Sequence, residues 1–134
     1  MSVNYLINQL LNYGLKNNLI EILEDSSYAP FTFEELADIS KIEKETLKEL
    51  LIQLKEENIV YESKKHRFGL LKQFNLYIGT IDVKEKGYGF IACPSFEKEF
   101  FVPKLNVNGA MDKDKVMFKI TNTNTDESDE AVVV

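Results

Sequence analysis

The sequence predicts an α+β fold class in two parts, a helical part that ends in one β-hairpin and an all-β part of short strands. Before residue 58, apolar residues recur three and four positions apart, which is typical of amphipathic helices. After residue 76, apolar and polar residues alternate over short runs, as in half-buried strands. We therefore expect two domains, residues 1–72 and 76–134, joined by a short linker at residues 72–75.

The first segment predicts two helices that are separated at Gly14. One helix is expected over residues 3–13, with an apolar face made of Val3, Leu6, Ile7, Leu10 and Leu11. Because glycine weakens a helix, Gly14 is expected to end or kink it. A second helix over residues 16–24 would bury Leu19, Ile20, Ile22 and Leu23. The turn-rich residues 25–30 then end the helical pattern.

Two further helices follow, each with its own boundary signal. Thr32 and Glu35 have the spacing of a capping box, which predicts a short helix that buries Leu36 and Ile39. A longer helix is expected over residues 43–57, with a core face made of Leu47, Leu50, Leu51 and Leu54. Asn58 is suited to the left-handed conformation that ends a helix.

Residues 59–62 and 68–71 read as two strands joined by a short basic turn. Helices followed by such a hairpin predict a winged helix, a variant of the helix-turn-helix. Residues 36–51 read L-A-x-x-S-K-I-x-x-E-T-L-K-x-L-L, the usual sequence of that unit in many bacterial proteins. On the outer face of the 43–57 helix, acids match or exceed bases, which disfavours reading of DNA. Protein contact or structural support is the default interpretation of that helix.

The turn of the hairpin carries a run of positive charge made of Lys64, Lys65, His66 and Arg67. Lys64, Lys65 and Arg67 would contact a phosphate backbone, including that of structured RNA, without reading bases. A solvated turn is an equally good interpretation, and the residues alone leave both open. We expect His66 to be an ordinary exposed histidine, because no nucleophile or acidic partner is spaced around it.

The second part predicts a small closed barrel. Strands are expected at residues 77–83, where Gly79 would allow a bend, and then around residues 88–93, 100–103 and 115–121. Residues 131–134 open a fifth strand that is truncated, since four residues barely close a barrel. This order fits a five-stranded OB barrel, a fold that binds oligonucleotides on its second and third strands. We expect Asp112 and Asp114 to be turn caps and no metal site to be present.

A motif rich in aromatic residues stands at residues 86–91, with the sequence K-G-Y-G-F-I, and F-F-V-P follows at residues 100–103. Alternation sends Tyr88 and Phe90 to the same face of a strand, where Phe101 from the next strand can join them. Bases of single-stranded RNA stack on such rings. Lys84, Lys86 and Lys104 are the candidate phosphate contacts. The competing interpretation is that the rings are core residues.

These two motifs resemble the ribonucleoprotein motifs of the cold-shock domain, K-G-F-G-F-I and V-F-V-H, with Tyr88 in place of the first Phe and Pro103 where the His stands. The chain has no Trp, and Val83 lies nearest to the cold-shock tryptophan. The F-V-P variant, the A-M-x-x-D-x-V run at residues 110–116 and the preceding helical domain together resemble the N-terminal region of bacterial ribonuclease R.

The resemblance implies that this chain is the N-terminal fragment of a longer exoribonuclease that works from 3′ to 5′. The missing C-terminal domains would be a second cold-shock domain, a catalytic domain with Mg²⁺ on clustered aspartates, and an S1 domain. The aspartates of this chain are scattered among unlike turns and strands, so we assign no catalytic residue and no cofactor to it. Its role would be to bind single-stranded RNA and feed it to the catalytic domain.

Composition narrows the remaining choices. The net charge of −6 lies outside residues 76–125, where seven lysines face six acids, so stacking should outweigh charge in RNA binding. The single cysteine, Cys93, fits a buried thiol in a reducing compartment. No apolar run is long enough for a membrane span, and we expect a cytoplasmic protein without membrane contact. Two rival functions stay open: a DNA-binding transcription regulator of the winged-helix type, and a protein–protein interaction module.

Overall fold

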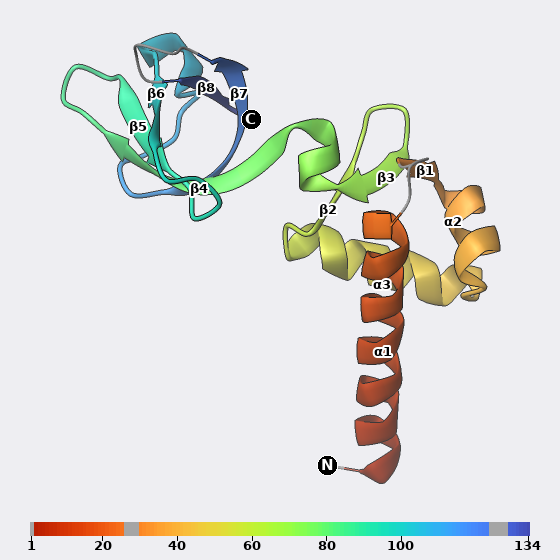
Figure 1. The fold of residues 1–134 in the computed structure, drawn as a ribbon. Coiled ribbons are helices and arrows are strands. Elements are labelled where there is room, and N and C mark those ends of the chain that lie inside the picture. The colour runs from red at the N-terminus through yellow and green to blue at the C-terminus, as the bar shows by residue number, and fades with distance from the viewer. Residues whose placement is uncertain (1, 26–29, 124–128) are drawn as a thin grey trace. The chain divides into compact units, whose positions relative to one another are not determined.

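The structure, a computed structural model, describes residues 2–25, 30–123 and 129–134 (Figure 1). The chain divides into two compact units, Met1–Phe74 and Asn75–Val134, which we call the N-terminal unit and the barrel. The first contains helices and a small sheet, and the second is a closed five-stranded barrel. The predicted α+β fold class is therefore confirmed. None of the helices in the described ranges combines the length and apolar character needed to cross a membrane.

The N-terminal unit has the element order of a winged helix. In chain order its elements are α1 (Val3–Asp25), β1 (Phe31–Thr32), α2 (Phe33–Ser40), α3 (Lys44–Glu56), β2 (Val60–Glu62) and β3 (Arg67–Leu70). The three short strands pair antiparallel in the order β1-β3-β2, so the predicted hairpin lies at one edge of a sheet. We call the β2–β3 hairpin and its turn the wing.

The boundaries of α2 and α3 agree with the capping and helix-ending residues predicted from the sequence. Thr32 Oγ1 accepts a hydrogen bond from Glu35 N at 3.2 Å, and Glu35 Oε1 accepts one from Thr32 N at 3.0 Å, which confirms the capping box. Asn58 has a φ of 59°, as expected after α3. The core face of α3 is also confirmed, because Leu47, Leu50, Leu51 and Leu54 are all buried. The prediction for Ile39 was wrong: its side chain is 51 % exposed, while Ala37 is buried with Leu36.

The predicted break at Gly14 was wrong, because α1 is one continuous helix of 23 residues. A Cβ added at Gly14 would meet nothing within 4 Å, so no neighbour forces the chain to turn there. Only the second half of the helix packs into the unit, through the buried Leu19 and Leu23. The apolar face predicted for the first half of the helix is exposed: Val3, Leu6, Ile7, Leu10 and Leu11.

Residues 72–74 of the predicted linker lie in the short 3₁₀ helix η1 (Leu71–Phe74) of the N-terminal unit, and Asn75 begins the barrel. Gln73 ties η1 down, since its Nε2 donates to Leu23 O at 2.9 Å and its Oε1 accepts from Leu70 N at 2.7 Å. The Phe74 ring contacts the Tyr61 ring with centroids 5.1 Å apart. Tertiary contacts therefore pack residues 73 and 74 into the N-terminal unit, although the sequence predicted a linker there.

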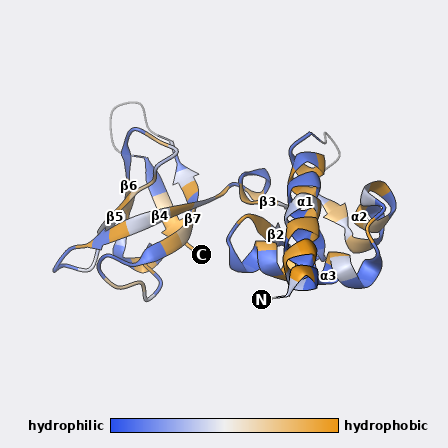
Figure 2. Cartoon of the chain, turned by 90° about the horizontal axis from the view of Figure 1, so that it is seen from below, coloured by the Kyte–Doolittle hydropathy of each residue, from blue (hydrophilic) through white to orange (hydrophobic). Residues whose placement is uncertain are grey.

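The barrel consists of β4 (Leu76–Val83), β5 (Gly89–Ala92), β6 (Glu99–Val102), β7 (Lys115–Asn122) and β8 (Glu130–Val133), closed in the order β4-β5-β6-β8-β7. All neighbours are antiparallel except β6 and β8. This is the arrangement of an OB fold. The colouring of Figure 2 shows hydrophobic residues alternating with polar ones along β4 and β5.

Alternation also fills the barrel core, where Ile81, Ile91, Phe100, Val102 and Phe118 are fully buried. Gly79 is required for a reason other than the expected bend. A Cβ there would lie 2.6 Å from both Ala92 O and Ile91 Cγ2, so β4 and β5 could not approach as they do.

The four-residue strand β8 closes the barrel fully, although we expected it to be barely long enough. It pairs antiparallel with β7 and parallel with β6, and Ala131 and Val133 are buried. Phe101 N donates to the Asp129 carbonyl at 2.8 Å, and the buried Asp129 side chain forms an ion pair with Lys98. Most of the predicted acidic loop, residues 124–128, lies outside the described residues.

The continuity of α1 can be tested by Gly14→Ala. Alanine should stabilise the helix by about 0.5–1 kcal/mol, because it loses less backbone entropy and meets no clash. Amide hydrogen exchange of residues 3–13, followed by NMR, should then slow by about twofold to fivefold. Exchange that is unchanged across those residues would indicate two helices that fold independently on either side of Gly14.

Candidate nucleic-acid interface

Three aromatic rings meet on the outer face of β5 and β6, and we call Tyr88, Phe90 and Phe101 the platform. Phe90 and Phe101 are directly paired in the antiparallel register, and Tyr88 stands just before β5. The centroids are 5.9 Å apart for Tyr88 and Phe90, 5.8 Å for Tyr88 and Phe101, and 5.6 Å for Phe90 and Phe101. All three side chains are half-buried, so each ring keeps a solvent-accessible surface.

The residues between the rings hold the platform outward. Ile91 points into the barrel and is fully buried, as are Phe100 and Val102 on the paired strand. A Cβ at Gly89 would lie 3.0 Å from Asp82 O and 3.1 Å from Ile81, so a side chain there would push β4 away by a few tenths of an ångström. The core thus fixes which face of β5 and β6 carries the rings.

Gly87 shapes the edge of the platform. Its φ of 99° is strained for any residue with a side chain, and its amide donates to Lys84 O at 2.9 Å in the β4–β5 turn. A Cβ there would lie 2.9–3.0 Å from the Lys104 stem, so this stem lies directly against Gly87. Lys86 and Lys104 are exposed, and neither has an ion pair among the residues that the structure describes.

Lys84 has a different environment from the other two candidate lysines. Its Nζ lies 2.9 Å from Asp82 Oδ2 and 6.0 Å from the Phe90 ring centroid. Lys113 Nζ contacts the other oxygen of Asp82 at 2.8 Å. Hydrogen bonds from the Lys113 ammonium first, and then from the Lys84 ammonium, hold the pKa of the Asp82 carboxyl well below its usual range. The charge of Lys84 is therefore opposed at the platform's edge.

The sequence did not reveal the Asp82–Lys113 contact, because 31 positions separate the two residues. The neighbouring acids do behave as the predicted turn caps. Asp112 Oδ1 accepts from Val83 N and Asp114 Oδ2 accepts from Met111 N, both at 2.8 Å. In the described ranges, no three His, Cys, Asp or Glu side chains are grouped as metal ligands would be.

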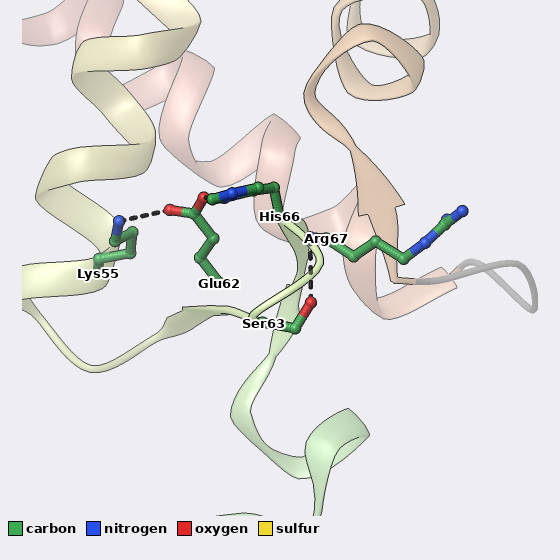
Figure 3. Close-up of polar contacts among 5 residues, drawn as sticks. All are labelled: Lys55, Glu62, Ser63, His66 and Arg67. Atoms are coloured by element: carbon green, nitrogen blue, oxygen red, sulfur yellow. Dashed lines mark hydrogen bonds and ion pairs between the residues drawn. The ribbon is translucent and has the colours of Figure 1, made fainter.

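The wing holds a second set of charges (Figure 3). The Glu62 carboxylate accepts from Lys55 Nζ of α3 at 2.7 Å and lies 2.8 Å from His66 Nδ1. Lys55 first, and then His66, lower the pKa of Glu62. The expectation that His66 has no acidic partner was therefore wrong. Its side chain is nevertheless 82 % exposed, as an ordinary surface histidine is.

The predicted wing cations divide into two groups. Arg67 extends away from His66 in Figure 3, donates to Pro30 O at 3.3 Å and lies 3.5 Å from Glu35 Oε1. Lys64 and Lys65 are exposed in the turn, and in the described part of the chain neither makes an ion pair. On α3, Lys44 is paired with Glu34 at 2.8 Å, which reduces the positive charge that this helix could offer to DNA.

Replacing Asp82 by Asn tests the charge cluster. The pKa values of Lys84 and Lys113, which Asp82 raises, should fall toward their ordinary values in an NMR titration. Because folding lowers the pKa of Asp82, its contribution to stability is present above its unfolded pKa of about 3.9 and is lost as the pH falls through the folded value. The difference in unfolding free energy between parent and variant should therefore narrow as the pH falls below about 3.9.

Glu97→Gln is the matched control, since it removes an exposed carboxyl of the same unit. It should leave the pKa values of both lysines as they are in the parent. Unchanged pKa values of Lys84 and Lys113 in the Asp82→Asn variant would show that Asp82 does not pair with these lysines.

Comparisons with known proteins agree with the barrel's architecture. Residues 79–134 match the family model described as the Ribonuclease B OB domain. No curated protein matches the chain. Among solved structures, the crystal structure of an IcIR transcriptional regulator from Alicyclobacillus acidocaldarius is 12 % identical with a TM-score of 0.42, a likeness too low to support an argument. The alignment covers 78 % of this chain and about half, 52 %, of that one. The barrel is thus an OB domain similar to that of ribonuclease B.

Proposed function

We propose that the barrel binds single-stranded RNA by stacking bases on the platform. The observation that carries this proposal is the meeting of three half-exposed rings, 5.6–5.9 Å apart, on β5 and β6. These are the second and third strands of the barrel, the face on which OB folds bind oligonucleotides. The match of residues 79–134 to a ribonuclease OB domain supports RNA as the ligand.

Stacking supplies most of the affinity in this proposal. Each stacked base contributes about 1–3 kcal/mol, whereas the lysine and acid counts of residues 76–125 nearly cancel. Lys86 and Lys104 contact phosphates at the platform's edge, and Lys84 contributes less because Asp82 opposes its charge. We therefore expect a weak salt dependence.

We further infer that the chain serves a 3′–5′ exoribonuclease resembling ribonuclease R. Its platform would feed a single strand to a catalytic domain outside this chain, and the Mg²⁺ would be held there. The ribonuclease OB match and the motif arrangement at residues 86–91, 100–103 and 110–116 support this inference. Full-length protein that degrades single strands equally well without the platform rings would contradict it.

The stacking role is tested by replacing Tyr88, Phe90 and Phe101 together with Leu, which keeps apolar volume but removes the rings. In a fluorescence titration with a single-stranded oligoribonucleotide, Kd should rise at least tenfold. The slope of log Kd against log salt should stay the same, because the lysines remain. Lys86→Ala with Lys104→Ala should instead lower that slope by about 0.7 for each lost phosphate contact.

Tyr5→Leu is the matched control, since it replaces an exposed tyrosine outside the barrel. It should bind as the parent does. If the triple-Leu variant is folded by NMR and binds RNA with the parent's affinity, the platform is not the binding site. In that case the interaction-module interpretation takes its place.

We also propose that the wing contacts the phosphate backbone of structured RNA through Lys64 and Lys65. Both are exposed in the turn without an ion pair in the described residues, and phosphate contacts position a nucleic acid without reading its sequence. Arg67, the third candidate, contributes less because its guanidinium donates to Pro30 O and lies 3.5 Å from Glu35 Oε1.

Replacing Lys64 and Lys65 by Ala tests the wing. Affinity for an RNA hairpin with a 3′ tail should fall several-fold, while affinity for the tail alone stays unchanged, because the proposed contact is with the phosphates of structured RNA. Lys44→Ala with Lys48→Ala is the matched control, which removes two lysines from α3. A larger loss in that control, together with tight binding to one duplex DNA sequence, would favour a transcription regulator.

A further inference from the structure

The first half of α1 exposes an apolar surface that the N-terminal unit does not use. In Figure 1 this half extends away from the rest of its unit, with the N-terminus at the free end. Its large apolar side chains are 48–71 % exposed: Val3, Tyr5, Leu6, Ile7, Leu10, Leu11 and Tyr13. Exposed apolar residues that gather on one surface mark interaction sites, whereas scattered ones do not.

Part of this surface faces away from the packed face of the same helix. Leu10 and Leu19 are nine positions apart, and at 3.6 residues per turn this places them about 180° from each other. Leu19 is fully buried in the unit, while Leu10 is 71 % exposed. Leu10 therefore does not continue the unit's own core and belongs to a second face, whereas Tyr5, which is 18 positions or five full turns from the buried Leu23, lies on the packed side of the helix.

The second face has the spacing of a coiled-coil seam. Val3, Leu6, Leu10 and Tyr13 follow one another at intervals of three, four and three residues, as a and d positions do. We call these four residues the α1 seam. Ile7 and Gly14 lie beside it, and Gly14 has open space where a side chain would stand, so another helix can approach closely.

Charge decides which partner fits the seam. Residues 2–15 contain no Asp, Glu, Lys or Arg. RNA binding and membrane-surface helices both rely on Lys and Arg, so neither ligand suits this segment. Two copies of this uncharged segment can pair without bringing like charges together. The remainder of the chain carries the net charge of −6, so contacts between two copies outside this segment are opposed by repulsion.

We propose that residues 3–13 of α1 pair antiparallel with the same segment of a second copy of this chain. In this arrangement Leu6 of each copy faces Leu10 of the other, and Val3 faces Tyr13, so every layer joins an a position to a d position. The pair is symmetric about a two-fold axis, as most homodimers are. Antiparallel helices also place the two acidic N-terminal units at opposite ends.

Analytical ultracentrifugation of the full chain over a dilution series tests the pairing. The mass should rise from 15.5 kDa toward twice that value as the concentration increases. Leu6→Glu with Leu10→Glu should keep the chain monomeric throughout. Both positions lie in the exposed half of α1, so NMR spectra of residues 30–123 should stay the same and exclude unfolding as the cause.

The matched control is Asn4→Glu with Asn8→Glu, which adds the same two charges at the same spacing on the polar side of the helix. It should dimerise as the parent does. A parent chain that stays monomeric at every concentration overturns the proposal. Equal loss of dimer in the seam variant and in the control also overturns it, because charge anywhere on α1 would then suffice.

Mixing two variants tests the orientation. Leu6→Glu and Leu10→Lys should each weaken the homodimer, and an equimolar mixture should form a heterodimer, because antiparallel pairing places the new acid opposite the new base. Recovery only when Leu10→Glu is mixed with Leu10→Lys would overturn the antiparallel arrangement. A parent chain that stays monomeric but binds another protein domain through the α1 seam would overturn self-pairing and show that the seam binds a different partner.

Discussion

The pairing of β5 with β6 is the constraint on which the barrel and its candidate interface both depend. The register that places Phe90 opposite Phe101 also places Ile91 opposite Phe100. One pair forms the outer platform, and the other is fully buried in the core. Because side chains alternate, a slip of one residue would expose the core pair and bury the rings. The free energy of core packing therefore also holds the binding face in position.

Close approach of the backbone completes that face. Gly79 and Gly89 let β4 and β5 lie together, and Gly87 leaves room for the stem of Lys104. The acidic residues nearby act on the barrel's own turns and lysines: Asp112 caps a strand end, and Asp82 binds Lys84 and Lys113. This use of carboxylates leaves the stacking surface free of acids in a barrel whose seven lysines and ten acids give a net charge of −3.

The N-terminal unit separates its surfaces by charge. Its core uses the second half of α1 and the apolar face of α3, and it leaves the uncharged first half of α1 unpacked. The wing, by contrast, pairs Glu62 with Lys55 of α3 and with His66, and it leaves Lys64 and Lys65 exposed. One small unit therefore presents a neutral apolar seam and a cationic turn, and these surfaces suit different classes of partner.

The sequence by itself determined what depends on neighbours a few positions apart. The capping box at Thr32, the core face of α3 and the strand alternation that brings the rings together all follow from local periodicity. Only the tertiary structure decided the continuity of α1 through Gly14, the exposure of Ile39 and the pairing of Lys113 with Asp82. These features depend on which distant surfaces meet, and periodicity shows that a face is apolar without showing what covers it.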